Sequence, residues 1–127
     1  MNIDIMTPDQ LAQMDQLISN AQTVLVVCHK SPDGDAVGSS LGMADYLRLR
    51  GKEATVIVPD QYPDFLQWLP NSEKIIRYDK HRDKCDMLFK IADLIVCLDF
   101  NAPSRVDEME SALVNSTARK ILIDHHL

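Results

Sequence analysis

Three short runs of apolar, largely β-branched residues are the clearest pattern in the chain. Residues 23–28, 94–98 and 120–123 are almost continuously apolar, which is typical of strands that are buried on both faces. Residues 54–58 have the same character, and residues 74–78 form a shorter and more polar candidate. These five segments predict a mainly parallel sheet of about five strands, because parallel sheets are normally covered on both faces.

Segments with helical signals separate these runs. Thr7-Pro8-Asp9-Gln10 combines a cap residue, a first-turn proline and a capping box, and predicts a helix that continues to about residue 21. Gly51 marks the end of a second predicted helix. That helix covers 35–50, and shorter helical segments are predicted at 62–69, 85–91 and 104–114. The alternating order predicts a Rossmann-like, three-layer α/β fold with helices on both faces of the sheet and right-handed crossovers.

The predicted helix at 35–50 has enough apolar positions to pack against the sheet. Two glycines along it are expected to allow a close approach between helix and sheet. The apolar positions are Leu41, Met43, Ala44, Leu47 and Leu49, and the glycines are Gly38 and Gly42.

The composition is that of a single globular domain. The chain has 127 residues, of which 46% are apolar and 25% charged, so it is not a disordered segment. No apolar stretch approaches the roughly 20 residues of a membrane span, and the start MNIDIMTPDQ lacks the pattern of a secretory signal. Cys28, Cys85 and Cys97 are odd in number and form no C-x-x-C motif, which predicts reduced thiols. Together these features predict a cytoplasmic protein.

The charge balance restricts the class of partner. The net charge is −6 and the isoelectric point is about 5.0, which argues against electrostatic capture of duplex DNA. Small anionic substrates remain compatible with this charge, because a carboxylate-rich pocket can bind them through metal cations.

Residues with metal-binding chemistry follow three of the apolar runs. Since parallel sheets bind ligands at the carboxyl ends of their strands, the three clusters are expected to form one site. Histidine nitrogens combined with carboxylate oxygens suit Mn, Zn or Fe. The alternative is that these aspartates only cap helices or stabilise turns. The clusters are His29, Asp33 and Asp35, then Asp99, then Asp124, His125 and His126.

The third cluster is the hardest to explain by packing alone. Successive side chains of a strand point in opposite directions, so His125 and His126 should reach different places, one a metal and the other a bound anion. Asp124 can then orient a histidine ring by accepting its N–H. The alternative is a frayed chain end.

In order and spacing, the three clusters resemble the first three motifs of the DHH phosphoesterase superfamily. The phrases VCHKSPDGDAVGSSLG and ILIDHHL, together with the amino-terminal helix, are most similar to the NrnA-type oligoribonuclease/pAp phosphatase group. The resemblance covers essentially all 127 residues and implies that 1–127 is the amino-terminal part of a DHH catalytic domain. The resemblance also implies a fourth metal-binding aspartate motif and a carboxy-terminal substrate domain downstream. The chain stops at Leu127, just after its last predicted strand and with no covering helix, which likewise predicts further chain in the natural protein. The isolated chain is therefore expected to have little or no activity.

The resemblance also implies a division of roles. His29, Asp33 and Asp99 would hold one Mn²⁺ ion, and Asp35, Asp99 and His125 a second, with Asp99 bridging the two. Mg²⁺, Co²⁺ or Zn²⁺ are possible substitutes. His126 would contact the scissile phosphate and Asp124 would orient a histidine, so that Asp99, Asp124 and His126 form the catalytic group. Two such ions activate water for in-line attack on phosphorus.

The implied activity is hydrolysis of short 5′-phosphorylated oligonucleotides to mononucleotides, or of pAp to AMP. The expected partners are short single-stranded oligonucleotides or small nucleotides, not duplex DNA or membranes, and a homodimer is compatible with the resemblance. Two enzymatic alternatives stay open: an inorganic pyrophosphatase or exopolyphosphatase, and a cyclic dinucleotide phosphodiesterase. The non-enzymatic alternative is a Rossmann-like binding or regulatory module with a vestigial site. No G-x-G-x-x-G loop follows the first predicted strand, which argues against a dinucleotide cofactor.

Overall fold

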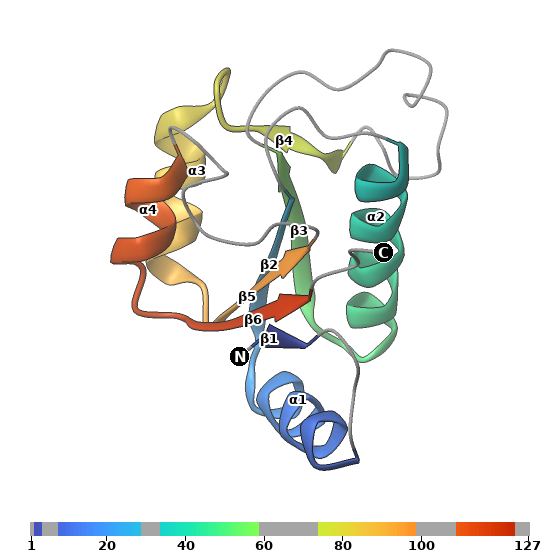
Figure 1. Ribbon diagram of the computed structural model, residues 1–127. Helices are drawn as coiled ribbons and strands as arrows, with labels where there is room; N and C mark the ends of the chain where they lie inside the picture. The colour runs from blue at the N-terminus through green and yellow to red at the C-terminus, as the bar shows by residue number, and fades with distance from the viewer. Residues whose placement is uncertain (1, 4–7, 29–33, 59–73, 99–108, 124–127) are drawn as a thin grey trace.

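A computed structural model describes residues 2–3, 8–28, 34–58, 74–98 and 109–123. These residues form one parallel sheet whose strands run in the order β1-β6-β5-β2-β3-β4 (Figure 1). The strands are β1 (Asn2–Ile3), β2 (Thr23–Cys28), β3 (Glu53–Val58), β4 (Ile76–Arg77), β5 (Leu94–Leu98) and β6 (Arg119–Ile123). The helices are α1 (Pro8–Asn20), α2 (Gly34–Leu49), α3 (Arg82–Ile91) and α4 (Glu110–Asn115).

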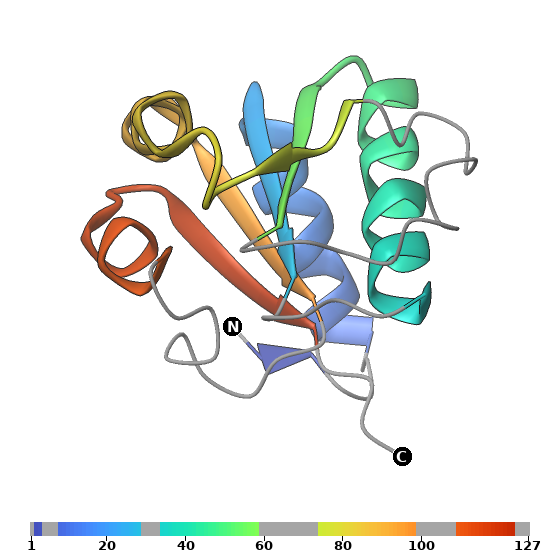
Figure 2. The ribbon, with the colours of Figure 1, turned by 90° about the horizontal axis from the view of Figure 1, so that it is seen from above.

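The sheet lies between two helical layers, with α1 and α2 on one face and α3 and α4 on the other (Figure 2). Successive residues of β2 alternate between the two cores, because side chains along a strand point to opposite faces. Val24 and Val26 pack in the cluster that contains Ile18 and Leu47. Leu25 and Val27 pack in the cluster that contains Phe89. Strand β2 is therefore buried on both faces, which explains its continuous apolar sequence.

The chain reverses its direction across the sheet between β2 and β5. From β2 it proceeds outward to β3 and β4, and it then returns to the other side of β2 to form β5 and β6. The helix of the first half, α2, and the helices of the second half, α3 and α4, consequently cover opposite faces, as right-handed crossovers require. The fold thus has a topological switch point between β2 and β5.

The predicted α/β architecture is confirmed, with several differences in detail. Strand β1 was not predicted, because two residues carry no periodic signal and its formation depends on pairing with β6. Helix α3 begins at Arg82, three residues earlier than predicted, because polar residues form its first turn. Within α4, the described part begins at Glu110. The helix predicted at 62–69 and the residues 104–108 lie outside the described residues.

Two expectations about α2 were wrong. Leu49 is 88% exposed and does not pack on the sheet, because it lies about 200° around the helix from buried Leu47. A Cβ atom added at Gly38 or Gly42 would meet nothing within 4 Å, so neither glycine mediates a close approach. The remaining apolar positions do face the sheet: Leu41, Ala44 and Leu47 are buried and Met43 packs against their cluster.

The three cysteines are free and buried, as predicted for reduced thiols. Cys28 and Cys97 lie in β2 and β5, and Cys85 lies in α3. None of the helices in the described part of the chain is long and apolar enough to cross a membrane.

Candidate active site

The carboxyl ends of three neighbouring strands lie in one row of the sheet. Cys28, the last residue of β2, is in register with Leu98, the last residue of β5. Leu98 is in register with Ile123, the last residue of β6. In the sequence, the next residues are His29, Asp99 and Asp124, each a predicted member of the site. The strands therefore end together at the positions from which all three motifs continue.

The switch point makes this row a natural place for a ligand. At such a point the connections from two adjacent strands leave in opposite directions, which opens a crevice outside their carboxyl ends. Here the adjacent strands are β2 and β5, which precede His29 and Asp99 in the sequence. The two strands that precede the first and second motifs in the sequence therefore flank the switch point.

The predicted ligands themselves fall mainly outside the described residues. Asp35 is the second residue of α2, in its first turn. The other six are His29, Asp33, Asp99, Asp124, His125 and His126, and all lie in segments that are not described. Among the residues that are described, no group of three His, Cys, Asp or Glu side chains is placed to hold a metal ion. The predicted ligand assignments therefore stay predictions.

The strand ends are held by a tightly packed apolar platform. Cys28, Leu98 and Ile121 are at most 2% exposed, and all three belong to the core beneath α1 and α2. Because well-packed cores resist displacement of their side chains, this platform fixes the spacing of the strand ends. A rigid base of this kind is what a multi-ligand metal centre requires.

A fixed charge pair lies at the same edge of the sheet. Arg77, which ends β4, pairs with Val58, which ends β3. Its guanidinium donates two hydrogen bonds to Asp79, from Nε at 3.1 Å and from Nη2 at 2.7 Å. The Arg77 hydrogen bond lowers the pKa of the Asp79 carboxyl, so this aspartate stays ionised and paired. The pair therefore adds little net charge to this edge of the sheet.

Sequence reasoning missed one residue that organises the strands of the site. Asp93 directly precedes β5, and its carboxylate accepts hydrogen bonds from the backbone N–H groups of Gln22 at 2.8 Å and Thr23 at 3.0 Å. These bonds lower the pKa of the Asp93 carboxyl. The partners are about 70 positions away in the sequence, so the available local signal, a polar residue before an apolar run, could not identify them.

Comparison with known proteins connects this arrangement to one family. The family model for the DHH family, N-terminal domain, matches residues 23–127, a range that contains all seven predicted site residues. Over 105 residues the chain is 37% identical to the bifunctional oligoribonuclease and PAP phosphatase NrnA of Thermus thermophilus, covering 81% of this chain and 28% of that protein. It is 26% identical over 120 residues to the cyclic-di-AMP phosphodiesterase GdpP of Bacillus subtilis, covering 89% of this chain and 18% of that protein.

A solved structure shares the fold closely. The crystal structure of an exopolyphosphatase-related protein from Bacteroides fragilis superimposes with a TM-score of 0.93 at 44% sequence identity. The match covers 97% of this chain and 36% of that one. The chain thus spans between 18% and 36% of the length of these three relatives.

Proposed function

Because the chain belongs to the DHH family, we propose that it carries the metal centre of a phosphoesterase. The observation that supports this most directly is the common register of Cys28, Leu98 and Ile123 at the switch point. Neighbouring strands are about 4.8 Å apart and consecutive Cα atoms about 3.8 Å. The residues that follow these strand ends therefore start close enough together to contribute to one site.

The donor set fits divalent cations. Imidazole nitrogens combined with several carboxylate oxygens match Mn²⁺ and Zn²⁺, and the clustered carboxylates need cations to offset their repulsion. In this proposal one ion is held by His29, Asp33 and Asp99, and the other by Asp35, Asp99 and His125. When bound, such ions lower the pKa of a water molecule and stabilise charge on phosphoryl oxygens. Manganese is the proposed metal.

The remaining residues act on the substrate and on one another. His126 contacts an oxygen of the scissile phosphate, which holds the phosphorus in position for attack. Asp124 accepts the N–H of a histidine ring and so fixes which ring nitrogen is free to act as a ligand. Asp35 lies in the first turn of α2, and Asp99 supplies the carboxylate shared by both ions.

We propose short 5′-phosphorylated oligonucleotides and pAp as substrates. This choice is supported by the 37% identity to a protein named as an oligoribonuclease and PAP phosphatase. The domain that would grip the nucleotide, together with a fourth metal-binding aspartate, is proposed to lie in a longer chain, since the 105 matched residues correspond to only 28% of that relative. We also propose that the protein forms a homodimer and that it is cytoplasmic. The buried, free cysteines favour a reducing compartment.

Two related activities have specific support. The similarity to GdpP favours hydrolysis of a cyclic dinucleotide, and the structural likeness to an exopolyphosphatase-related protein favours a polyphosphate substrate. The same metal centre suits all three, because each reaction cleaves a bond to phosphorus with water. The substrates differ in what lies beyond the phosphate, so specificity depends on residues outside the metal centre.

A calorimetric titration of Mn²⁺ into the chain, after removal of metals with a chelator, tests the centre. Wild type is expected to bind Mn²⁺, and Asp99→Asn is expected to lose at least one binding event, because it removes the shared carboxylate. Asp83→Asn is the matched control, since it removes an exposed carboxylate in the first turn of α3. Equal binding by wild type and Asp99→Asn contradicts the proposal, as does no binding by a wild-type protein that includes the proposed fourth aspartate.

A second experiment distinguishes the substrates. The longest natural form of the protein is incubated with Mn²⁺ and with pApA, pAp, cyclic di-AMP or tripolyphosphate in separate reactions. Fastest release of AMP from pApA or pAp supports the proposed nucleotidase. Preferential cleavage of cyclic di-AMP would instead indicate a cyclic dinucleotide phosphodiesterase, and preferential cleavage of tripolyphosphate a polyphosphate hydrolase. Activity that survives Asp99→Asn rejects the two-metal mechanism for all of these substrates.

A further inference from the structure

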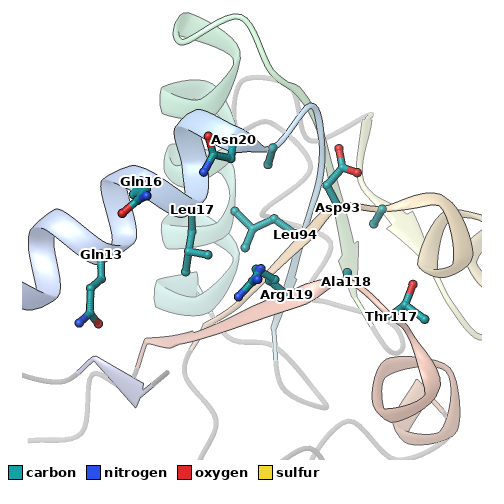
Figure 3. A pocket seen from close by; sticks show the side chains of 11 residues that line it. Gln13, Gln16, Leu17, Asn20, Asp93, Leu94, Thr117, Ala118 and Arg119 are labelled. Carbon is teal, nitrogen blue, oxygen red and sulfur yellow. The ribbon is translucent and has the colours of Figure 1, made fainter.

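A cavity of about 660 Å³ lies at the other end of the sheet, between α1 and the amino ends of β5 and β6 (Figure 3). Leu94 and Arg119, the first residues of these strands, line it, whereas the predicted metal ligands follow the last residues of the same strands. Five strand residues span about 13 Å, so the two regions are separate. The lining residues are Gln13, Gln16, Leu17, Asn20, Ala21, Ala92, Asp93, Leu94, Thr117, Ala118 and Arg119.

Arg119 differs from the other arginines in the described part of the chain. Arg48, Arg50 and Arg77 form ion pairs with aspartates, and Arg82 lies over the ring of Tyr78. The exposed guanidinium of Arg119 has no hydrogen bond or ion pair with any described residue. It therefore offers five N–H donors and a full positive charge to the cavity.

The polar side chains around Arg119 are also without partners among the described residues. Gln13, Gln16 and Asn20, on successive turns of α1, line one side of the cavity, and Thr117 lines the other (Figure 3). Each carboxamide can donate two hydrogen bonds and accept others, and the hydroxyl can do both. Together with Arg119, these side chains offer more N–H and O–H donors than the two oxygens of a carboxylate can accept. A phosphate group attached to a polar molecule has enough acceptor atoms for them.

The rest of the lining suits the body of such a ligand. Leu17 and Leu94 provide an apolar surface between the polar residues (Figure 3). Asp93 adds one carboxylate, whose Oδ2 already accepts two backbone N–H groups, so its other oxygen can accept a hydrogen bond from a ligand donor. A cavity of this volume is within the usual range for small-molecule sites.

We propose that this cavity is a second binding site, for a small phosphorylated molecule such as a nucleoside monophosphate. Its phosphate pairs with the Arg119 guanidinium, whose planar fork matches phosphate oxygens. Its polar body is hydrogen-bonded by Gln13, Gln16 and Asn20 and lies against Leu17 and Leu94. The site is independent of the proposed metal centre, because none of these residues belongs to it.

An NMR titration of the ¹⁵N-labelled chain, with chelator present, tests this site. The probes are AMP, inorganic phosphate, adenosine and acetate. AMP is expected to cause saturable shifts in the backbone amides of Leu17, Ala21, Leu94 and Ala118. Arg119→Gln is expected to raise the Kd for AMP and for phosphate by about tenfold or more, because it removes the charge but keeps the side chain polar.

The controls separate this site from others. Arg82→Gln removes an exposed guanidinium on the opposite face and should leave the Kd for AMP unchanged; Asp99→Asn should do the same. Asn20→Ala should weaken AMP binding more than phosphate binding, because Asn20 is assigned to the polar body of the ligand. The NMR spectra also show whether each variant is folded. Absence of saturable shifts at millimolar AMP, equal affinity in Arg119→Gln, or acetate binding as tight as phosphate overturns the proposal.

Discussion

The side chain and backbone of Asp93 both bind Thr23, which starts the neighbouring strand. The Asp93 carboxylate accepts the Thr23 N–H at 3.0 Å, and the Thr23 carbonyl accepts the Asp93 N–H at 2.9 Å. The Asp93 carbonyl also accepts the N–H of Arg119 at 3.0 Å. One residue thus joins the amino ends of β2, β5 and β6, the three strands whose carboxyl ends precede the predicted ligands.

Asp93→Ala is therefore expected to lower the free energy of unfolding by about 1 kcal/mol, because two backbone N–H groups lose a charged acceptor at a solvent-accessible site. Urea denaturation followed by circular dichroism measures this change. Glu53→Gln, at the exposed start of β3, is the control for loss of one negative charge and should be nearly neutral. An Asp93→Ala variant as stable as wild type would show that the hydrogen bonds to the Asp93 carboxylate do not stabilise the fold.

Asp93 also gives stability a pH dependence. The backbone hydrogen bonds from Thr23 and Gln22 lower the pKa of its carboxyl in the folded state. A carboxyl with a lowered folded-state pKa stabilises the protein above its unfolded pKa, and that contribution is lost as the pH falls through the folded pKa. The stability difference between wild type and Asp93→Ala should therefore shrink on acidification below about pH 4. A difference that is constant from neutral pH to pH 3 contradicts this assignment.

Tyr78 supplies the opposite dependence at high pH. Burial, assisted by a 2.7 Å hydrogen bond from its hydroxyl to Asp86, raises its pKa from 10.0 to about 12. Tyr78→Phe should cost about 1 kcal/mol near neutral pH, because Asp86 loses a donor while the ring keeps its edge contact with Phe89. An acid with a raised folded-state pKa stabilises the fold below its unfolded pKa and loses that contribution as the pH rises. Denaturation at pH 9, 10 and 11 should show the difference from wild type shrinking; a widening difference refutes the sign.

Two leucines of β5 allow packing to be separated from site geometry. Leu98 and Leu94 are both buried in the core beneath α1 and α2, and Leu98 directly precedes Asp99. Leu98→Ala and Leu94→Ala should each destabilise the fold by about 2–5 kcal/mol, measured by thermal denaturation. Under the proposed function, only Leu98→Ala should also weaken Mn²⁺ binding clearly, because the void left by its shortened side chain lies directly before Asp99. Equal weakening by both variants would indicate a general loss of fold.

The three cysteines should be unreactive until the protein unfolds. Burial raises the pKa of the Cys97 thiol to about 12 and that of Cys85 to about 11, and Cys28 is also buried. Since the thiolate is the reactive form, a chromogenic disulfide reagent at pH 8 should label native protein only as fast as it unfolds. Denaturant should release all three thiols at once. Val114→Cys, at a side chain that is 55% exposed, should react rapidly in the native state and serves as the positive control.

The sequence predicted the parts of the fold that local patterns determine. Residues 23–28 and 94–98 are apolar because both faces of their strands are buried, and they are the central strands β2 and β5. The order of elements predicted a parallel sheet and hence strand ends at one edge, and the register of Cys28, Leu98 and Ile123 agrees with this.

Features that depend on distant partners could not be predicted. Strand β1 exists only through pairing with β6, and the role of Asp93 depends on Gln22 and Thr23. Leu49 is a different case, because helical periodicity alone puts it about 200° around α2 from buried Leu47, and its residue type misled the prediction. For the candidate site, the sequence supplied the residues and the fold supplied the strand ends that precede His29, Asp99 and Asp124.

The arrangement of β1 has a consequence for how the protein is made. Its Asn2 is in register with Leu122 of β6, so an edge of the sheet joins residues that are synthesised far apart in time. The central β2–β5 pairing likewise connects Val24 with Leu94. Contacts of such large sequence separation slow folding, and parallel sheets with unpaired strands are prone to aggregate until they close. Strands β2 and β3 are synthesised before β5 and β6, so the sheet can close only after its last strand has been made, and slow folding is the expected kinetic consequence.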